Sequence, residues 1–302
     1  MSARHVTLLA ALAAIWGGSY LLIKYALDGF SAAAIVSFRC LLASAVLYSA
    51  LRATGAAKPA LSELRARPRW ALILGLTAVA FPFMLITFGE HVVPSGLTAV
   101  LISPASLFVA LFAPAIDASE RIDRRQALGM GVGLLGVAMV VGVESLSTLD
   151  EFLGALAMIG AAAFYGLSTF VVKGRFGHLA SMQTSWIAVT TAGVVTLPVA
   201  LATTPGHTPT LGAATALLVL GVVGTALAFV IFYKLINEIG GGRASLVSYL
   251  APGVALFYGA LFRDEAITVA AVGGLVLILG GVYIASRKSA PRVKAAPAPA
   301  RA

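Results

Sequence analysis

The chain has 302 residues, of which 60% are hydrophobic and only 11% are charged, less than half the roughly 25% charged fraction of a typical soluble domain. A mean hydropathy of +0.97 excludes a soluble globular protein, because such a chain has too few polar residues to cover an aqueous surface. The single cysteine, Cys40, excludes an intrachain disulfide and a multi-cysteine zinc site.

Apolar runs of about 20 residues, the length that a helix needs to cross a bilayer, recur along the chain. Runs such as AVGGLVLILGGVYIA are apolar on every side, which favours helices over a membrane β-barrel. We therefore predict an all-α membrane protein with ten spans, at residues 6–27, 31–51, 70–89, 95–116, 126–143, 152–173, 182–202, 211–235, 243–262 and 268–286. The first run is as long as the others, so no cleavable signal peptide is expected. The basic Pro/Ala-rich tail, residues 289–302, is expected to be disordered.

Lysine and arginine are unevenly distributed between the predicted loops. If the N-terminus is cytoplasmic, 18 of the 21 basic residues fall in cytoplasmic segments, while the opposite side keeps Arg263 and most of the acidic residues. This bias predicts that both termini are cytoplasmic. It also accounts for the net charge of +9 without a nucleic-acid partner.

The second half of the sequence repeats the first at an offset of about 148 residues. The motif AAIWGGS at 13–19 corresponds to AAFYGLS at 162–168, and TAVAF at 77–81 corresponds to TALAF at 225–229. Five spans per repeat is an odd number, so the second copy enters the membrane with inverted orientation. We predict a first five-helix repeat at 1–146 and an inverted one at 147–288. Inverted repeats are typical of transporters with a substrate site near the membrane midplane.

The repeated motifs resemble the ten-helix EamA branch of the drug/metabolite transporter superfamily. The resemblance runs through WGGSYLLIK and GLTAVLISPASLFVALFAP in the first half and GVVGTALAFVIFYKLINEIGGGRASLVSYLAPG in the second. In length and general look the chain is similar to the YddG-like amino-acid exporters, associated with aromatic amino acids. The resemblance implies a bacterial inner-membrane transporter that exports small metabolites, above all amino acids, by alternating access. The family's usual GER before the fifth and tenth spans reads SER at 119–121 and RDE at 263–265.

Aromatic and hydroxyl side chains within the spans are predicted to line a substrate cavity, with ring faces for an apolar substrate body and hydroxyls for its polar groups. The predicted lining residues are Trp16, Ser19, Tyr20, Arg39, Phe81, Ser103, Tyr165, Ser168, Phe229, Ser245, Ser248, Tyr249 and Tyr258. Two alternatives stay open: aromatic residues also form interfacial belts, and serines in spans often bond only their own backbone.

Glycine and proline mark the predicted hinges. Gly17 and Gly18 weaken the first span, and Pro104 and Pro252 occupy repeat-related positions in the fourth and ninth spans. The glycines of the fifth and tenth spans predict close helix packing, either between the two halves or in a homodimer.

Charged residues inside the spans are few. Arg39 lies about 12 Å below the external boundary at the helical rise per residue, and it binds either a substrate carboxylate or carbonyl groups at a helix end. The structural role is favoured, because the resemblance implies that an arginine here belongs to the general family pattern. No span holds an acidic residue away from its ends, and Glu90 and Glu238 are expected at the level of the lipid headgroups. Substrate exchange without a proton or sodium gradient is therefore expected.

Two other classes of function remain. A passive channel or facilitator would have the same composition. An integral-membrane enzyme would need a catalytic set, but the four histidines lie at or outside span ends without metal-ligand spacing. We therefore expect a transporter with a small-molecule substrate and no cofactor or metal.

Overall fold

The computed structural model describes residues 2–116, 122, 124–143, 148–203, 208–244 and 246–286, and all regular elements in these ranges are helical. Side-chain caps begin several helices where the sequence offers a hydroxyl. Ser31, Thr148 and Thr210 each accept a hydrogen bond from the backbone N–H three residues further on. The predicted tail, residues 289–302, lies outside the described residues.

Seven helical segments in these ranges are long and apolar enough to cross a membrane. They are α1 (Ala3–Leu27); α2 (Ala32–Ala53); α4 (Pro68–Gly75) with η1 (Leu76–Ala80) and α5 (Phe81–Gly89); α6 (Ser95–Ile102) with α7 (Ala105–Ile116); α9 (Leu149–Val171) with η2 (Val172–Phe176); α10 (Ser181–Ala202); and α11 (Leu211–Gly221) with η3 (Val222–Leu227) and α12 (Ala228–Ile239). The three other predicted spans fall on α8 (Arg124–Val143), α14 (Val247–Arg263) and α15 (Val269–Ser286), and two short helices are α3 (Ala57–Ala66) and α13 (Gly241–Ala244).

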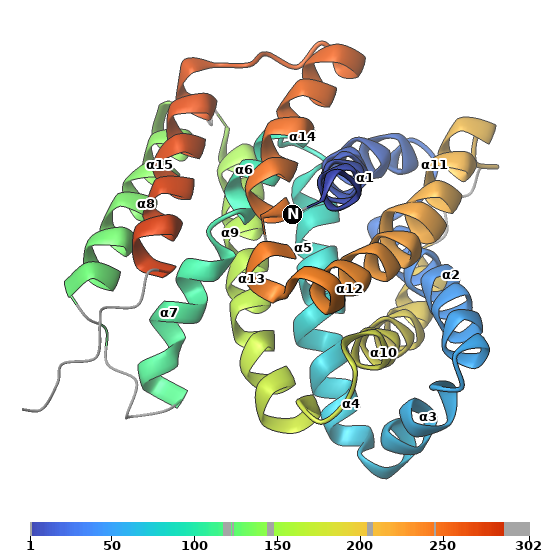
Figure 1. The fold of residues 1–302 in the computed structure, drawn as a ribbon. Helices are drawn as coiled ribbons and strands as arrows, with labels where there is room; N and C mark the ends of the chain where they lie inside the picture. Colours follow the sequence, from blue (N-terminus) through green and yellow to red (C-terminus); the bar gives the residue numbers. More distant parts are fainter. Residues whose placement is uncertain are drawn as a thin grey trace, which may run out of the picture.

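The helices pack in pairs that join distant parts of the chain. Figure 1 shows α8 and α15 side by side at one edge of the molecule, with α2 and α10 on the other side. Between them, α1 packs against α14, and α9 packs against α5 and α7. The largest cluster of buried side chains runs through α2, α5, α6, α9 and α10.

Three of the spans contain a short π-helical stretch, η1, η2 or η3, which the sequence did not predict. η1 includes most of the TAVAF motif, and η3 includes the start of TALAF. A π turn admits one extra residue per turn and is found frequently at functional sites. η1 and η3 therefore fall on positions that the internal repeat relates.

Small residues let α8 and α15 approach closely. A Cβ atom on Gly136 would lie 2.7 Å from the carbonyl oxygen of Gly274 and 2.8 Å from the backbone nitrogen of Ile278. A Cβ atom on Gly129 would lie 2.6 Å from the carbonyl oxygen of Gly281. Of the two expected uses of these glycines, the structure shows packing within one chain.

Replacing Gly136 by alanine should loosen this contact, because backbone atoms of α15 cannot move aside as a flexible side chain can. We expect Gly136→Ala to lower the unfolding temperature in detergent, at a cost of about 1 to 3 kcal/mol. Gly131→Ala, on the same helix, is the matched control, since nothing lies within 4 Å of its added Cβ. Equal unfolding temperatures for the two variants would contradict the packing role.

Candidate functional site

Arg39 of α2 joins three spans at the centre of the bundle. Its side chain is 8% exposed, and its Nε donates a hydrogen bond of 2.7 Å to the Thr225 hydroxyl in η3. The guanidinium carbon lies 4.0 Å from the centroid of the Phe83 ring in α5. A desolvated cation over a ring is stabilised by about 2 kcal/mol. The partners are thus a hydroxyl and a ring face.

The two terminal amino groups of Arg39 donate no hydrogen bond to any residue that the structure describes. Two predicted cavity residues, Tyr20 of α1 and Tyr165 of α9, are half-buried and interact electrostatically with Arg39. A guanidinium edge presents two parallel N–H groups that match a carboxylate. The arrangement can therefore bind an organic acid beside two phenol rings.

The π turn explains how Thr225 reaches Arg39. Its hydroxyl donates a 2.9 Å hydrogen bond to the carbonyl of Leu220, five residues earlier, and accepts the bond from Arg39. Thr225 and Phe83 were not predicted as site residues. The signal for Thr225 was present, because it opens the repeated TALAF motif.

Three of the predicted serines bond the backbone of their own helices, which is the alternative to cavity lining. Ser19, Ser103 and Ser168 donate to a carbonyl three or four residues earlier in their own helices, at 2.9, 2.6 and 2.8 Å. Ser248 is exposed, and Ser245 lies outside the described residues. The structure therefore does not bring these hydroxyls to Arg39.

The predicted aromatic residues pack in pairs. Ring centroids lie 5.2 Å apart for Trp16 and Phe232, 5.1 Å for Phe81 and Phe164, and 5.9 Å for Phe229 and Tyr233. Phe81 is 45% exposed, whereas Tyr249 and Tyr258 are half-buried on α14. Trp16 belongs to a separate apolar cluster with α12 and α14, away from the cluster that contains Tyr20 and Tyr165.

The predicted hinge residues lie in different surroundings. Pro104 occupies the break between α6 and α7, whereas Pro252 lies inside α14, which begins five residues earlier at Val247. A Cβ on Gly17 would lie 2.9 Å from the carbonyl oxygen of Ala251, and one on Gly18 would lie 3.3 Å from the Tyr258 ring. These two glycines thus allow α1 to approach α14.

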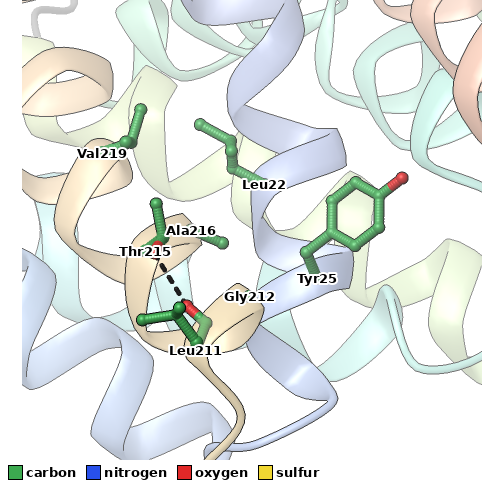
Figure 2. Close-up of a pocket in the computed structure, with 7 residues that line it drawn as sticks. All are labelled: Leu22, Tyr25, Leu211, Gly212, Thr215, Ala216 and Val219. Carbon is green, nitrogen blue, oxygen red and sulfur yellow. Dashed lines mark hydrogen bonds between the residues drawn. The ribbon is translucent and has the colours of Figure 1, made fainter.

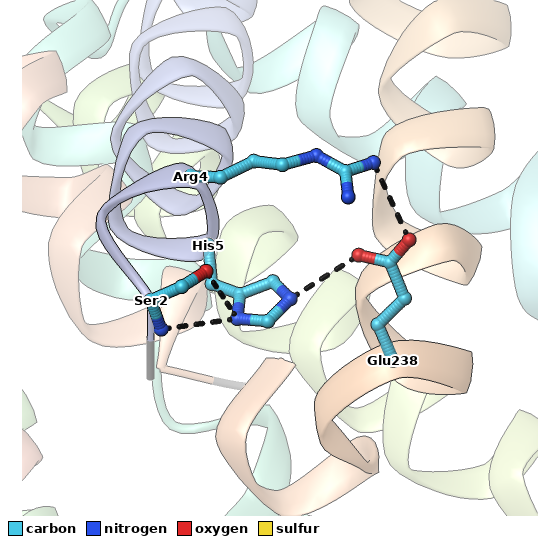
Figure 3. A network of polar contacts seen from close by, with 4 residues as sticks. All are labelled: Ser2, Arg4, His5 and Glu238. Carbon is cyan, nitrogen blue, oxygen red and sulfur yellow. Dashed lines mark hydrogen bonds and ion pairs between the residues drawn. The ribbon is translucent and has the colours of Figure 1, made fainter.

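The N-terminus of α1 is tied to the end of α12 by charged side chains (Figure 3). Arg4 and His5 contact the two carboxylate oxygens of Glu238 at 3.5 and 3.2 Å, and Ser2 contacts the other ring nitrogen of His5 at 3.1 and 3.3 Å. Glu238 is partly exposed, as expected of a residue at the headgroup level. This network lies on the side that the charge bias predicts to be cytoplasmic.

Two acidic residues at the opposite end, Glu265 and Glu90, differ in their partners and in their burial. The carboxylate of Glu265 accepts hydrogen bonds from the Ser95 N–H at 2.9 Å, the Ser95 hydroxyl at 3.0 Å and the Gly96 N–H at 3.0 Å, so it caps α6. Glu90 follows the last residue of α5, at a span end as predicted, but its carboxyl is 0% exposed. Neighbouring helices therefore cover this carboxyl, and the position of Glu90 at the level of the lipid headgroups stays a prediction.

A shallow groove lies apart from the Arg39 cluster, between α1 and α11 (Figure 2). Its volume is about 420 Å³, and its lining residues are mainly apolar: Leu22, Tyr25, Leu211, Gly212, Thr215, Ala216 and Val219. None of the predicted cavity residues is among them. The part of the chain that the structure describes holds no group of three metal-ligating side chains.

Comparison with known proteins gives a consistent result. The sequence model of the EamA-like transporter family matches residues 4–142 and again 152–287. A probable terminal-alkyne amino-acid exporter of Streptantibioticus cattleyicolor is 28% identical over 289 residues, which cover 95% of this chain and 94% of that protein. A probable amino-acid metabolite efflux pump of Salmonella typhimurium is 26% identical over 294 residues, covering 94% and 95%.

Solved structures extend the comparison to the fold. A protein of known crystal structure aligns with a TM-score of 0.65, at 18% identity, over 95% of this chain and 98% of its own. At this identity the similarity concerns the fold alone.

Replacing Thr225 by valine keeps the side-chain shape but removes the acceptor of Arg39. We expect Thr225→Val to destabilise the protein by about 1 to 3 kcal/mol, because a charged donor is left buried without a partner. Thr77→Val is the matched control: Thr77 occupies the repeat-related position and bonds only Ile73 of its own helix, at 2.7 Å. Thermal unfolding in detergent measures both, and an equal effect would show that the Arg39 contact contributes nothing.

Proposed function

Because the chain belongs to the EamA-like transporter family, we propose that it exports amino acids or closely similar metabolites across the bacterial inner membrane by alternating access. Family membership makes it a multi-pass membrane protein with a small-molecule substrate, and it indicates transport and not catalysis. Two relatives that match along nearly their whole length are named as an amino-acid exporter and an amino-acid metabolite efflux pump. Their names support both the substrate class and the direction.

The observation that carries the proposal is the orientation of Arg39. Its Nε is held by Thr225 and its face by Phe83, so the guanidinium is fixed in place, while the terminal amino groups have no partner among the described residues. A positively charged edge fixed in this way at membrane depth favours a substrate with a carboxylate. The Nε atom and the ring-facing side of the guanidinium thus have a structural role, and the terminal amino groups are proposed to bind the substrate.

Aromatic side chains near Arg39 are proposed to contact the rest of the substrate. Tyr20 and Tyr165 come from α1 and α9, on either side of α5, and both are half-buried beside Arg39. Phenol rings offer an apolar face and a hydroxyl, which suits an amino acid with an apolar or aromatic side chain. The remaining predicted cavity residues are proposed to act in other conformations, since their hydroxyls and rings are engaged elsewhere in this one.

The proposed architecture is a pair of inverted five-helix repeats, residues 1–146 and 147–288. Three observations support it. The family model matches each half separately, the π stretches η1 and η3 fall at repeat-related positions, and the same pairs of helices pack together in the two halves. The first span packs on the ninth as the sixth packs on the fourth, and the first packs on the eighth as the sixth packs on the third. Such pseudo-symmetry provides two equivalent conformations, each open to one side.

Opening toward the cytoplasm is proposed to break contacts between the helix ends on that side. On the cytoplasmic side these are the contacts of Arg4 and His5 with Glu238. The break at Pro104, the glycine pair at 17–18 and the proline within α14 are the proposed bending points, since the backbone hydrogen bonding is weakest at such positions.

Transport by the purified full chain in liposomes, measured for a panel of amino acids and their carboxamides, tests the function. The wild type should carry free amino acids, and Arg39→Lys should reduce their transport by at least about tenfold, because a single ammonium cannot replace the two-pronged contact. Transport of the carboxamide analogues should fall much less in the same variant, because they carry no carboxylate. Phe88→Ala, on the exposed face of α5, is the control that should change neither. Equal losses for all substrates would leave Arg39 a purely structural role.

The proposed topology predicts the side on which each loop lies. Reporters inserted at residues 60, 122 and 295 should be cytoplasmic, and those at 147 and 206 should be external, because each repeat contains five spans and the basic loops lie inside. Accessibility to a membrane-impermeant reagent in whole cells measures this. Finding 147 and 295 on the same side would contradict the inverted repeat.

A further inference from the structure

The outer end of α5 carries three buried polar atoms that have no hydrogen-bond partner in the described part of the chain. They are the hydroxyl of Thr87 and both carboxyl oxygens of Glu90. The two residues are 1% and 0% exposed, and a spacing of three places them on the same face of the helix. Buried polar groups without partners are rare in native structures, and each requires an explanation.

This site leaves no space for a bound molecule in the present conformation. The end of α5 is pressed against α9, where a Cβ on Gly89 would lie 2.8 Å from the carbonyl oxygen of Gly154. Each carboxyl oxygen of Glu90 is enclosed, so a water molecule, a metal ion or an ammonium group cannot contact it. A proton is the one ligand of a carboxylate that needs no additional volume.

The charges around Glu90 do not neutralise it. The charged and titratable groups that act on it are Lys24 and Tyr20 of α1, Arg39 of α2 and Glu265 after α14, while Gly154 and Met158 of α9, which pack against the adjacent Gly89, are uncharged. None of the cations forms an ion pair with Glu90 in the described residues, and Arg39 is held by Thr225. The C-terminus of α5, which carries partial negative charge, is a further unfavourable neighbour for an anion.

We propose that Glu90 is a proton-binding site that couples transport to the proton gradient, occupied in this conformation and emptied when the outer side opens. An enclosed carboxyl without donors is stable only in its neutral form, because taking an isolated carboxylate out of water is strongly unfavourable. Opening would bring water to Glu90. The proposal rests on the proposed transport function and adds its energy source.

Lys24 is the cation that would pair with the Glu90 carboxylate after the proton is lost. It is half-buried on α1, four residues before the exposed Asp28 at the end of that helix, and its other electrostatic neighbours are Glu265 and Arg263. When the Glu90 O–H bond breaks, the proton passes to external water and the carboxylate gains the Lys24 ammonium as its partner. Closing reverses the step: the carboxylate takes up a proton and Lys24 withdraws. Net flux then depends on the proton gradient, whereas exchange of substrate for substrate does not.

Infrared titration of the purified full chain tests proton binding without any substrate. The wild type should show the carbonyl band of a protonated carboxylic acid at neutral pH, and Glu90→Gln should remove it. Glu238→Gln is the matched control, since Glu238 is the repeat-related carboxylate and is already paired with Arg4 and His5. Absence of the band in the wild type, or its persistence in Glu90→Gln, would overturn the proposal.

A second variant keeps the test decisive if Glu90→Gln does not fold. Lys24→Met removes the cation that favours the ionised form, so the carboxylic acid band should persist to higher pH than in the wild type. An unchanged titration would contradict the pairing of Lys24 with Glu90.

Flux in liposomes separates this proposal from the proposed substrate class. With one proton exchanged per substrate, the accumulation of an amino acid should change about tenfold for each pH unit of imposed gradient, and Glu90→Gln should exchange substrate without responding to the gradient. If amino acids cross and the wild type ignores the gradient, proton coupling is wrong and the transport function stands. If no amino acid crosses but the infrared band behaves as expected, the substrate class is wrong and the proton site stands.

Discussion

Burying the guanidinium of Arg39 among apolar helices costs free energy unless its charge and donors find partners, and the way they are found determines how the centre of the molecule is built. The partners come from different spans: the Phe83 ring from α5 and the Thr225 hydroxyl from η3. Thr225 satisfies its own donor on Leu220 by the π turn. A contact between α2 and the eighth span thus depends on a helical irregularity, and the free edge of the arginine is a consequence of the same geometry.

Three glutamates of the chain have very different surroundings. Glu265 is fully satisfied by the N-terminus of α6, and Glu238 is paired at the surface, so both act as fixed contacts between spans. Glu90 has no partner among the described residues and no exposure. Stability does not account for such a group, because an uncompensated buried polar group is destabilising. A role in a conformational cycle does account for it, since its environment changes when the helices separate.

Much of the fold follows from the sequence, because hydropathy alone sets the length and position of a membrane helix. The predicted ranges coincide with helices or interrupted helices, and the glycine contacts of α8 with α15 were anticipated. The repeated TAVAF and TALAF motifs indicated a special position, but the π turns were not visible, since no residue type encodes them. The site was predicted in part: Arg39 was identified, whereas Thr225 and Phe83 depend on tertiary packing.

Burial was the weakest inference for single residues. Glu90 does lie at a span end, but its exposure is set by which helices cover that end, and a hydropathy plot contains no information on neighbours. Ser19, Ser103 and Ser168 were predicted as cavity groups, and in this conformation their hydroxyls bond carbonyls of their own helices, as the open alternative described.

The central claim is that one substrate site faces the two sides of the membrane in turn, and counterflow measures this most directly. Liposomes containing the purified chain are loaded with an unlabelled amino acid and diluted into a trace of the same labelled amino acid. Alternating access predicts that the label accumulates transiently inside the liposomes above its external concentration. Each outward passage of unlabelled substrate leaves the site facing outward, where it binds a labelled molecule and carries it inward. Simple equilibration without an overshoot would instead show a passive pore and contradict the account.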